Sequence, residues 1–260
     1  MRVVTDATRV PLDSIAAPPF PGGLPWVNAT RPPTTAQRGQ PLLVEFWDSC
    51  RPNSMRTLPY VKAWHERYHG DGLRVVGVHC PGFGPAREEP AVRNAVARLG
   101  ITYPVLIDTE LELWREYENL GWPARYLFDG RARLFDVHYG EGAYVETERE
   151  IQALLGVRRE PLAPLRPEDA PGAKLAAQTE DQPGAYCGPY AAGGVWAVLE
   201  GCGSVRVGAA AGAADATELR VTHPGAYPLI EHERHTAAVL ELELAAGVRC
   251  HATCFTPGLA

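Results

Sequence analysis

One stretch of the 260-residue chain carries its clearest structural signal: Val44-Glu45-Phe46-Trp47-Asp48-Ser49-Cys50-Arg51-Pro52-Asn53-Ser54-Met55-Arg56-Thr57-Leu58-Pro59. Its first residues end a nearly continuous apolar run over 41–47, which is typical of a strand buried on both faces. Apolar residues then recur with helical spacing over 54–69, and Pro59 is expected to kink that helix. A buried strand that leads directly into a helix indicates an α/β fold.

Strands and helices continue to alternate on both sides of this stretch. We expect strands at 26–28, 73–78 and 103–107, helices at 86–99, 111–118 and 144–155, and a hairpin with strands at 124–128 and 132–137. The alternation predicts a mostly parallel sheet with helices on its faces. The last two strands are joined too tightly for a crossover, so we expect them to be antiparallel and the sheet to be mixed.

The composition changes after residue 157. Residues 158–184 contain five prolines and many charges, which indicates a linker. From residue 185 onward the pattern is one of short strands and turns, which predicts a small all-β domain of sandwich or jelly-roll type. We therefore expect three parts: an α/β domain with an N-terminal extension over 1–157, the linker, and a β domain over 185–260 that packs on the first domain because its own core is small.

The opening stretch resembles the active-site strand and helix of a thioredoxin. A thioredoxin has Phe-Trp-x-x-x-Cys-x-x-Cys and then a proline five residues after the second cysteine. Phe46-Trp47 and Pro59 match this pattern, while Arg51 and Ser54 stand where the two cysteines belong. Cys50 lies one position too early. The resemblance implies a thioredoxin-like domain without ordinary dithiol exchange, because neither arginine nor serine can form the disulfide.

Further phrases resemble the DipZ family over residues 18–156, and the β domain resembles that family more weakly. They are Arg56-Thr57-Leu58-Pro59, Val76-Gly77-Val78-His79, Tyr103-Pro104, Trp122-Pro123-Ala124-x-Tyr126-Leu127 and Gly140-Glu141-Gly142-x-Tyr144 with Thr147-Glu148. Members of that family join a membrane electron carrier to an extracytoplasmic thioredoxin-like domain and a carbohydrate-binding-module-like β domain. We expect no transfer of electrons across a membrane here, since the chain shows neither the carrier nor a signal sequence.

Charge and composition narrow the classes of partner. The formal net charge of −6 argues mildly against nucleic acid and anionic membranes. The segment from Met1 to Arg9 has no apolar run of signal-peptide length, and the sequence has no membrane-spanning stretch, so we expect a cytoplasmic protein with six reduced cysteines. No phosphate loop or nucleotide fingerprint is present, and we expect no cofactor. The oligomeric state is not indicated.

Two cysteines are candidate catalytic residues. Cys50 lies beside Arg51 and Arg56, whose charges favour a thiolate that attacks a peroxide or forms a mixed disulfide with a partner protein or peptide. Cys80 follows the strand that ends at His79, and the carboxyl ends of neighbouring parallel strands meet, so Cys80 is a candidate resolving thiol. The structural alternatives are a leftover thiol at a degenerate site for Cys50 and an inert buried thiol for Cys80. His79 is either a base for a thiol or a structural residue.

The thioredoxin resemblance implies further site residues. Glu45 matches the buried acid behind the dithiol, and a carboxyl group there is expected to have a raised pKa. Pro123 matches the proline that follows a cis bond and presents backbone to an extended substrate. Trp47, Arg51, Ser54 and Trp122 would line the same groove, with Tyr126 nearby. The structural alternatives are a hydrogen-bonded core acid and aromatic residues that belong to the core.

Two other function classes stay open. The first is a non-catalytic binding or scaffold protein that holds a polypeptide in the groove near Pro123. The second is carbohydrate binding through aromatic residues of the β domain: Trp196, Tyr186, Tyr190 and Tyr227. A metal site is not expected, although His232, His235, Cys250 and Cys254 are ligand types, because on a strand the two cysteines would lie about 13 Å apart.

Overall fold

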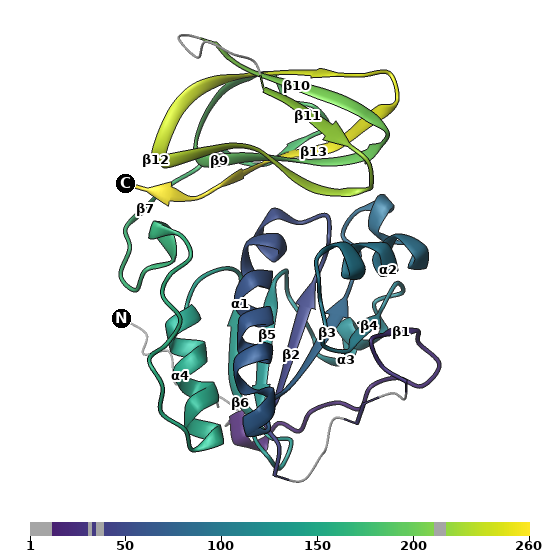
Figure 1. The fold of residues 1–260 in the computed structure, drawn as a ribbon, viewed down its shortest axis with the longest axis vertical. Coiled ribbons are helices and arrows are strands. Elements are labelled where there is room, and N and C mark those ends of the chain that lie inside the picture. Colours follow the sequence, from purple (N-terminus) through teal and green to yellow (C-terminus); the bar gives the residue numbers. More distant parts are fainter. Residues whose placement is uncertain (1–11, 31–32, 35–38, 211–216) are drawn as a thin grey trace, which may run out of the picture.

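The computed structural model describes residues 12–30, 33–34, 39–210 and 217–260. The chain forms an α/β domain and a β domain that sits across one end of it (Figure 1). The β domain lies above the carboxyl ends of β2 and β3, at the point where α1 begins (Figure 1). The expected packing of the β domain on the α/β domain is confirmed by an apolar cluster that both domains build.

The α/β domain is built on a six-stranded sheet in the order β1-β4-β3-β2-β5-β6. Strands β2, β3 and β4 are parallel, and β1, β5 and β6 are antiparallel to their neighbours, so the expected mixed sheet and terminal hairpin are confirmed. The strands are β1 (Trp26–Val27), β2 (Leu42–Trp47), β3 (Arg74–His79), β4 (Val105–Ile107), β5 (Ala124–Phe128) and β6 (Leu134–Tyr139).

Helices cover both faces of this sheet. They are α1 (Pro52–Tyr68), α2 (Glu89–Arg98), α3 (Glu112–Glu116) and α4 (Tyr144–Leu155). Side chains of β2 alternate between two cores: Leu43 and Trp47 pack with α1, α2 and α4, while Leu42, Val44 and Phe46 pack with α3. This alternation explains the unbroken apolar run, because both faces of the strand are covered. Helix α1 continues through Pro59.

The β domain contains one antiparallel sheet of six strands in the order β11-β10-β12-β9-β13-β8, which curls around its own core (Figure 1). Strand β12 changes register with β9 between Pro228 and Ile230 and between Glu231 and Thr236. The strands are β8 (Gln182–Pro183), β9 (Gly188–Gly201), β10 (Gly203–Ala210), β11 (Thr217–Val221), β12 (Gly225–Leu244) and β13 (Val248–Thr256). Two further strands, β7 (Leu175–Ala176) and β14 (Gly258–Leu259), pair with each other.

Residues 158–184, the segment predicted as a Pro-rich linker and called the strap from here on, contact both domains. The carboxylate of Glu168 lies 2.9 Å from the Arg56 guanidinium, and Asp169 accepts a 2.8 Å hydrogen bond from the Tyr60 hydroxyl. Both partners belong to α1, so the strap is attached to the α/β domain. Its second half supplies β7 and β8 to the β domain. The proline and charge content of the strap could not predict these contacts, because the partner residues lie about a hundred residues away in sequence.

Within the described part of the chain, no helix is long and apolar enough to cross a membrane. The expectation that the chain lacks a signal peptide rests on residues 1–9, which lie outside the described residues.

Candidate functional site

The candidate site lies in the loop between β2 and α1. Arg51 is the N-cap of α1, with extended backbone, and Pro52 is the first helical residue. Arg51 and Ser54 therefore occupy the start of the helix, and Cys50 lies just outside it. The thiol consequently lacks the direct contact with helical N–H groups that stabilises a thiolate at a helix N-terminus.

Asp48 organises this loop. Its Oδ1 accepts the N–H of Cys50 at 2.9 Å, its Oδ2 accepts the N–H of Gly82 at 2.8 Å, and its own N–H donates to Ser54 Oγ at 3.2 Å. The side chain is fully buried. Burial raises the pKa of Asp48 to about 6, against the lowering effect of the two N–H donors and Arg51. Ser54 is likewise fully buried, so it fixes the loop and does not line an open groove.

Arg51 fills the space at the first cysteine position. Its guanidinium carbon lies 4.3 Å from the ring centroid of Trp122 and 5.1 Å from that of Phe83, so the cation stacks between two aromatic rings. A Cβ on Gly82 would lie 2.8 Å from Arg51 Nε, so a larger residue at this position would require the guanidinium to shift. Trp122 is held in turn by its Nε1–H, which donates to the Cys80 carbonyl oxygen at 2.9 Å.

The backbone next to Pro123 is already engaged. The Trp122–Pro123 peptide bond is cis. The Trp122 carbonyl oxygen accepts a 2.6 Å hydrogen bond from the side-chain amide of Asn53. Trp47 and Pro123 are buried, Trp47 completely. The expected open groove lined by Trp47, Ser54 and Pro123 is therefore wrong for this arrangement of the chain.

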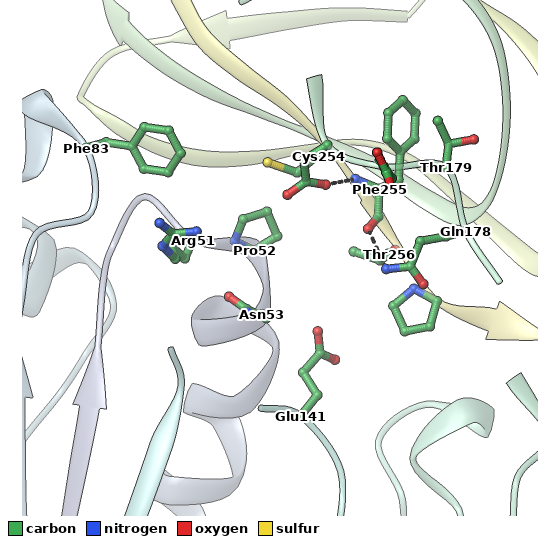
Figure 2. Close-up of a pocket in the computed structure, with 13 residues that line it drawn as sticks. Arg51, Pro52, Asn53, Phe83, Glu141, Gln178, Thr179, Cys254, Phe255 and Thr256 are labelled. Atoms are coloured by element: carbon green, nitrogen blue, oxygen red, sulfur yellow. Dashed lines mark hydrogen bonds between the residues drawn. The ribbon is translucent and has the colours of Figure 1, made fainter. Parts of the chain in front are cut away.

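A cavity of about 540 Å³ lies beside Arg51, between the two domains. In Figure 2, Arg51, Pro52 and Asn53 face Phe255 and Thr256 of β13 across it, with Glu141 below. Of the residues expected to line a groove, Arg51 alone borders this cavity. Cys254 also borders it and Cys50 does not.

Cys50 is a free thiol that is completely buried. Burial, followed by the charge of Asp48, raises the pKa of this thiol well above its usual range, although Ser49 and Arg98 act in the opposite direction. The expectation that Arg51 and Arg56 favour a thiolate is thus wrong for this structure. Arg56 is engaged with Glu141 and Glu168, at 2.7 and 2.9 Å.

Cys80 lies at the end of the neighbouring strand, as expected. Trp47 pairs with His79, and the Cys80 N–H donates to the Trp47 carbonyl oxygen at 3.0 Å. The Cys80 thiol, however, lies in the core on the α3 side and donates to Asp108 Oδ2 at 3.5 Å. Burial and Asp108 raise its pKa. Cys50 and Cys80 are therefore close in the fold but belong to different clusters, and both are free.

Two more ionisable groups are fully buried beneath the loop. Burial raises the pKa of Glu45 to about 8, as expected from the sequence. The charge of Arg125 and a 3.3 Å hydrogen bond from the Tyr103 hydroxyl act in the opposite direction and lower this pKa. Burial lowers the pKa of His79 to about 3, so its ring is neutral. His79 Nε2 accepts the N–H of Ser49 at 3.3 Å and lies 3.8 Å from Asp48 Oδ1. His79 is thus part of the support for the loop.

Comparison with known proteins supports this fold. No protein-family model matches the chain. Protein DipZ of Mycobacterium tuberculosis is 33% identical over 172 residues, which cover 63% of this chain and 25% of that protein. The thiol-disulfide oxidoreductase YkuV of Bacillus subtilis is 26% identical over 140 residues, 53% of this chain and 93% of that protein. A crystal structure of a thioredoxin-like superfamily protein matches with a TM-score of 0.50 and 21% identity, covering 56% of this chain and 99% of that one.

The α/β domain is thioredoxin-like. The chain spans about a quarter of the length of the DipZ proteins that it matches. Thiol-disulfide oxidoreductases are among the relatives of this thioredoxin-like domain. In this chain Arg51 and Ser54 lie at the start of α1.

Several site residues were missed by reasoning from the sequence. Asp48 accepts an N–H two residues ahead, which is an Asx turn and could have been found from the local pattern Asp-Ser-Cys. The apolar residues that cover Cys50 from the β domain have no such signal, because they lie about 150 to 200 residues away.

The aromatic residues considered for sugar binding, Tyr190, Trp196 and Tyr227, are mostly buried. Among the described residues no three His, Cys, Asp or Glu side chains form a metal-binding group.

Proposed function

We propose that this chain is a thiol redox protein in which one cysteine, Cys50, replaces the Cys-x-x-Cys pair of its relatives. The observation that carries the proposal is the set of buried ionisable groups around the Cys50 loop. Glu45, Asp48 and His79 are fully buried, with pKa values of about 8, 6 and 3. Burying three such groups in one place costs stability, and displaced pKa values gather at functional sites more often than in scaffolds.

The chemistry is a two-electron oxidation of the Cys50 sulfur. The thiol attacks a peroxide, an S–O bond forms, the O–O bond breaks, and the products are a sulfenic acid and water. A thiol of a partner protein then attacks the sulfenic acid and releases a second water, which leaves a mixed disulfide at Cys50. A second partner thiol reduces that disulfide. We assign resolution to a partner because the Cys80 thiol is bonded to Asp108.

Asp48 is the group that we propose as the proton acceptor. Its carboxylate already accepts the backbone N–H of Cys50, and its charge acts on the thiol. With a pKa of about 6, it is mostly ionised at neutral pH and is a stronger base than an ordinary aspartate. The reaction also requires contact between the Cys50 thiol and the peroxide, and in this structure the Cys50 side chain is completely buried.

The test is site-resolved oxidation of the reduced protein. Cys187 and Cys202 are exposed and would react first, so both are replaced by serine in the test protein. Hydrogen peroxide is added in small excess with dimedone, and each remaining cysteine is mapped by mass spectrometry. We expect dimedone on Cys50 in preference to Cys80, Cys250 and Cys254, and loss of that label in Cys50→Ser. Slow and uniform oxidation of the four thiols would overturn the proposal and favour a binding or scaffold role.

A further inference from the structure

The β domain supplies most of the cover over Cys50. The buried cluster around this thiol contains one other residue of the thioredoxin-like domain, Ala86, and four residues of the β domain: Trp196, Val198, Ala252 and Cys254. Strands β9 and β13 are neighbours, with Ala252 opposite Val198 and Cys254 opposite Trp196. The four residues therefore project from one face of the sheet onto the site.

A backbone hydrogen bond strengthens this contact at the loop. The N–H of Ala226, at the start of β12, donates to the Ser49 carbonyl oxygen at 3.0 Å. Gly225 lies against the same oxygen and against Arg98, since a Cβ there would be 3.5 Å from each. The loop that carries Cys50 is thus held between β12 on one side and the buried His79 ring on the other.

Cys80 provides an internal comparison. It is as completely buried as Cys50, but its cluster consists of residues from the thioredoxin-like domain and its N-terminal segment. Separation of the two domains would leave Cys80 covered and would uncover Cys50. Exposure of Cys80 instead requires opening of the core around β2 and β3.

We propose that the β domain is a cap on the redox site, and that its displacement from the loop 48–50 exposes Cys50 for reaction. This inference rests on the proposed function of Cys50 for its biological meaning. Each domain has its own core, so moving one from the other breaks few contacts compared with unfolding either domain. The strap stays attached to α1 through Arg56 and Tyr60, which would keep the displaced β domain close to the site.

Displacement would also change the reactivity of the thiol. Burial is the main cause of the raised pKa of Cys50, and water would reach the sulfur once the β domain moved away. Glu200 of the β domain, whose charge also raises that pKa, would move away with it. Asp48, which raises the pKa, and Ser49 and Arg98, which lower it, would stay beside the thiol, so the loss of burial is the main change. A closed cap therefore holds Cys50 as an unreactive thiol, and an open cap gives access to the peroxide and a more acidic thiol at the same time.

The test measures access to Cys50 and Cys80 separately. Alkylation by iodoacetamide is followed by mass spectrometry in the Cys187→Ser/Cys202→Ser background, with the further variants Ala252→Arg and Ala252→Ser. The arginine is a wedge in the interface, and the serine is a control of similar size to alanine. We expect Cys50 to react faster than Cys80 without a wedge, and Ala252→Arg to accelerate Cys50 by about tenfold or more with Cys80 unchanged. Ala252→Ser should leave both rates near those of the background.

Equal acceleration of Cys50 and Cys80 alkylation would indicate general unfolding and would contradict the proposed cap. The proposal would also be contradicted if Ala252→Arg folds and the alkylation rate of Cys50 does not change. If Ala252→Arg does not fold, Ala226→Pro removes the N–H that bonds to Ser49 and serves the same comparison. The cap and the redox role of Cys50 can be contradicted independently of each other. A Cys50 that is alkylated faster in Ala252→Arg but is not oxidised by peroxide keeps the cap and contradicts the redox function.

Discussion

Ala226 of the β domain donates its N–H to the carbonyl oxygen of Ser49 at 3.0 Å, and this bond ties the two domains together one residue before Cys50. The N–H of the same Ser49 donates to the buried ring of His79. The loop that bears the candidate thiol is therefore positioned by both domains.

The buried carboxyl of Glu45 should make stability depend on pH. Its pKa rises from 4.5 to about 8 on folding, so its contribution is complete below pH 4.5 and is lost as pH rises through 8. At about 1.4 kcal/mol per pKa unit the loss is at most about 5 kcal/mol. We expect urea denaturation to show falling stability between pH 6.5 and 8, and Glu45→Gln to remove most of that slope.

The window above pH 6.5 isolates Glu45 from its neighbours. His79, whose pKa is lowered on folding from 6.5 to about 3, destabilises the fold as pH falls from 6.5 toward 3, because the unfolded chain then binds a proton that the folded chain does not. Its effect is constant above pH 6.5. Asp48, whose pKa rises from 3.8 to about 6, loses its contribution mostly below that window. An identical slope in the wild type and Glu45→Gln would contradict the buried neutral carboxyl.

Ser54 is expected to be a structural residue. Its Oγ accepts the N–H of buried Asp48, and Ser54→Ala would leave that N–H without its partner. The loss of an acceptor to a buried donor costs about 1–3 kcal/mol. Ser54→Thr retains a hydroxyl and is the control. Denaturation curves that are the same for the alanine variant and the wild type would show that this bond does not stabilise the loop.

Gly82 is expected to leave room for the Arg51 guanidinium. A Cβ at this position would lie 2.8 Å from both Nε and Nη2 of Arg51, so Gly82→Ala should push the guanidinium away from Trp122. We expect a loss of about 1–2 kcal/mol, which combines lost cation–π contact with local repacking. A Cβ added at Gly84 would meet no atom within 4 Å, so Gly84→Ala is the matched control. Equal melting temperatures for the two variants would contradict the stacked arginine.

The attachment of the strap to α1 can be tested at Arg56. This side chain is mostly buried and pairs with Glu141 and Glu168, so Arg56→Gln should cost about 3 kcal/mol by leaving two carboxylates without their cation. The control is Arg93→Gln, which breaks an exposed pair with Glu89 and should cost no more than about 0.5 kcal/mol. Limited proteolysis should cut the strap faster in Arg56→Gln. Unchanged cleavage would contradict the attachment.

Much of the thioredoxin-like domain could be predicted because its signals are local. The apolar run at 41–47 predicted β2, and helical spacing predicted α4 to its observed ends, Tyr144 and Leu155. The alignment of Phe46-Trp47 and Pro59 placed Arg51 and Ser54 at the start of α1. These features depend on residues close together in sequence, so period and spacing are sufficient.

The state of Cys50 could not be predicted in the same way. Its burial depends on Val198 and Ala252, which are about 150 and 200 residues distant, and on which face of the β domain meets the site. The attachment of Asp169 to Tyr60 is equally non-local. Without these contacts the arginines near Cys50 indicated a thiolate, whereas desolvation dominates in the folded chain.

We propose that Cys50 is a redox thiol held beneath the β domain. The most direct measurement is the rate of dimedone-trapped sulfenic acid at Cys50 under peroxide, compared between Ala252→Arg and Ala252→Ser. We predict that the wedge raises this rate in proportion to the alkylation rate of Cys50, while Cys80 stays unmodified in both. An accelerated alkylation of Cys50 with no sulfenic acid in either variant would contradict the redox role.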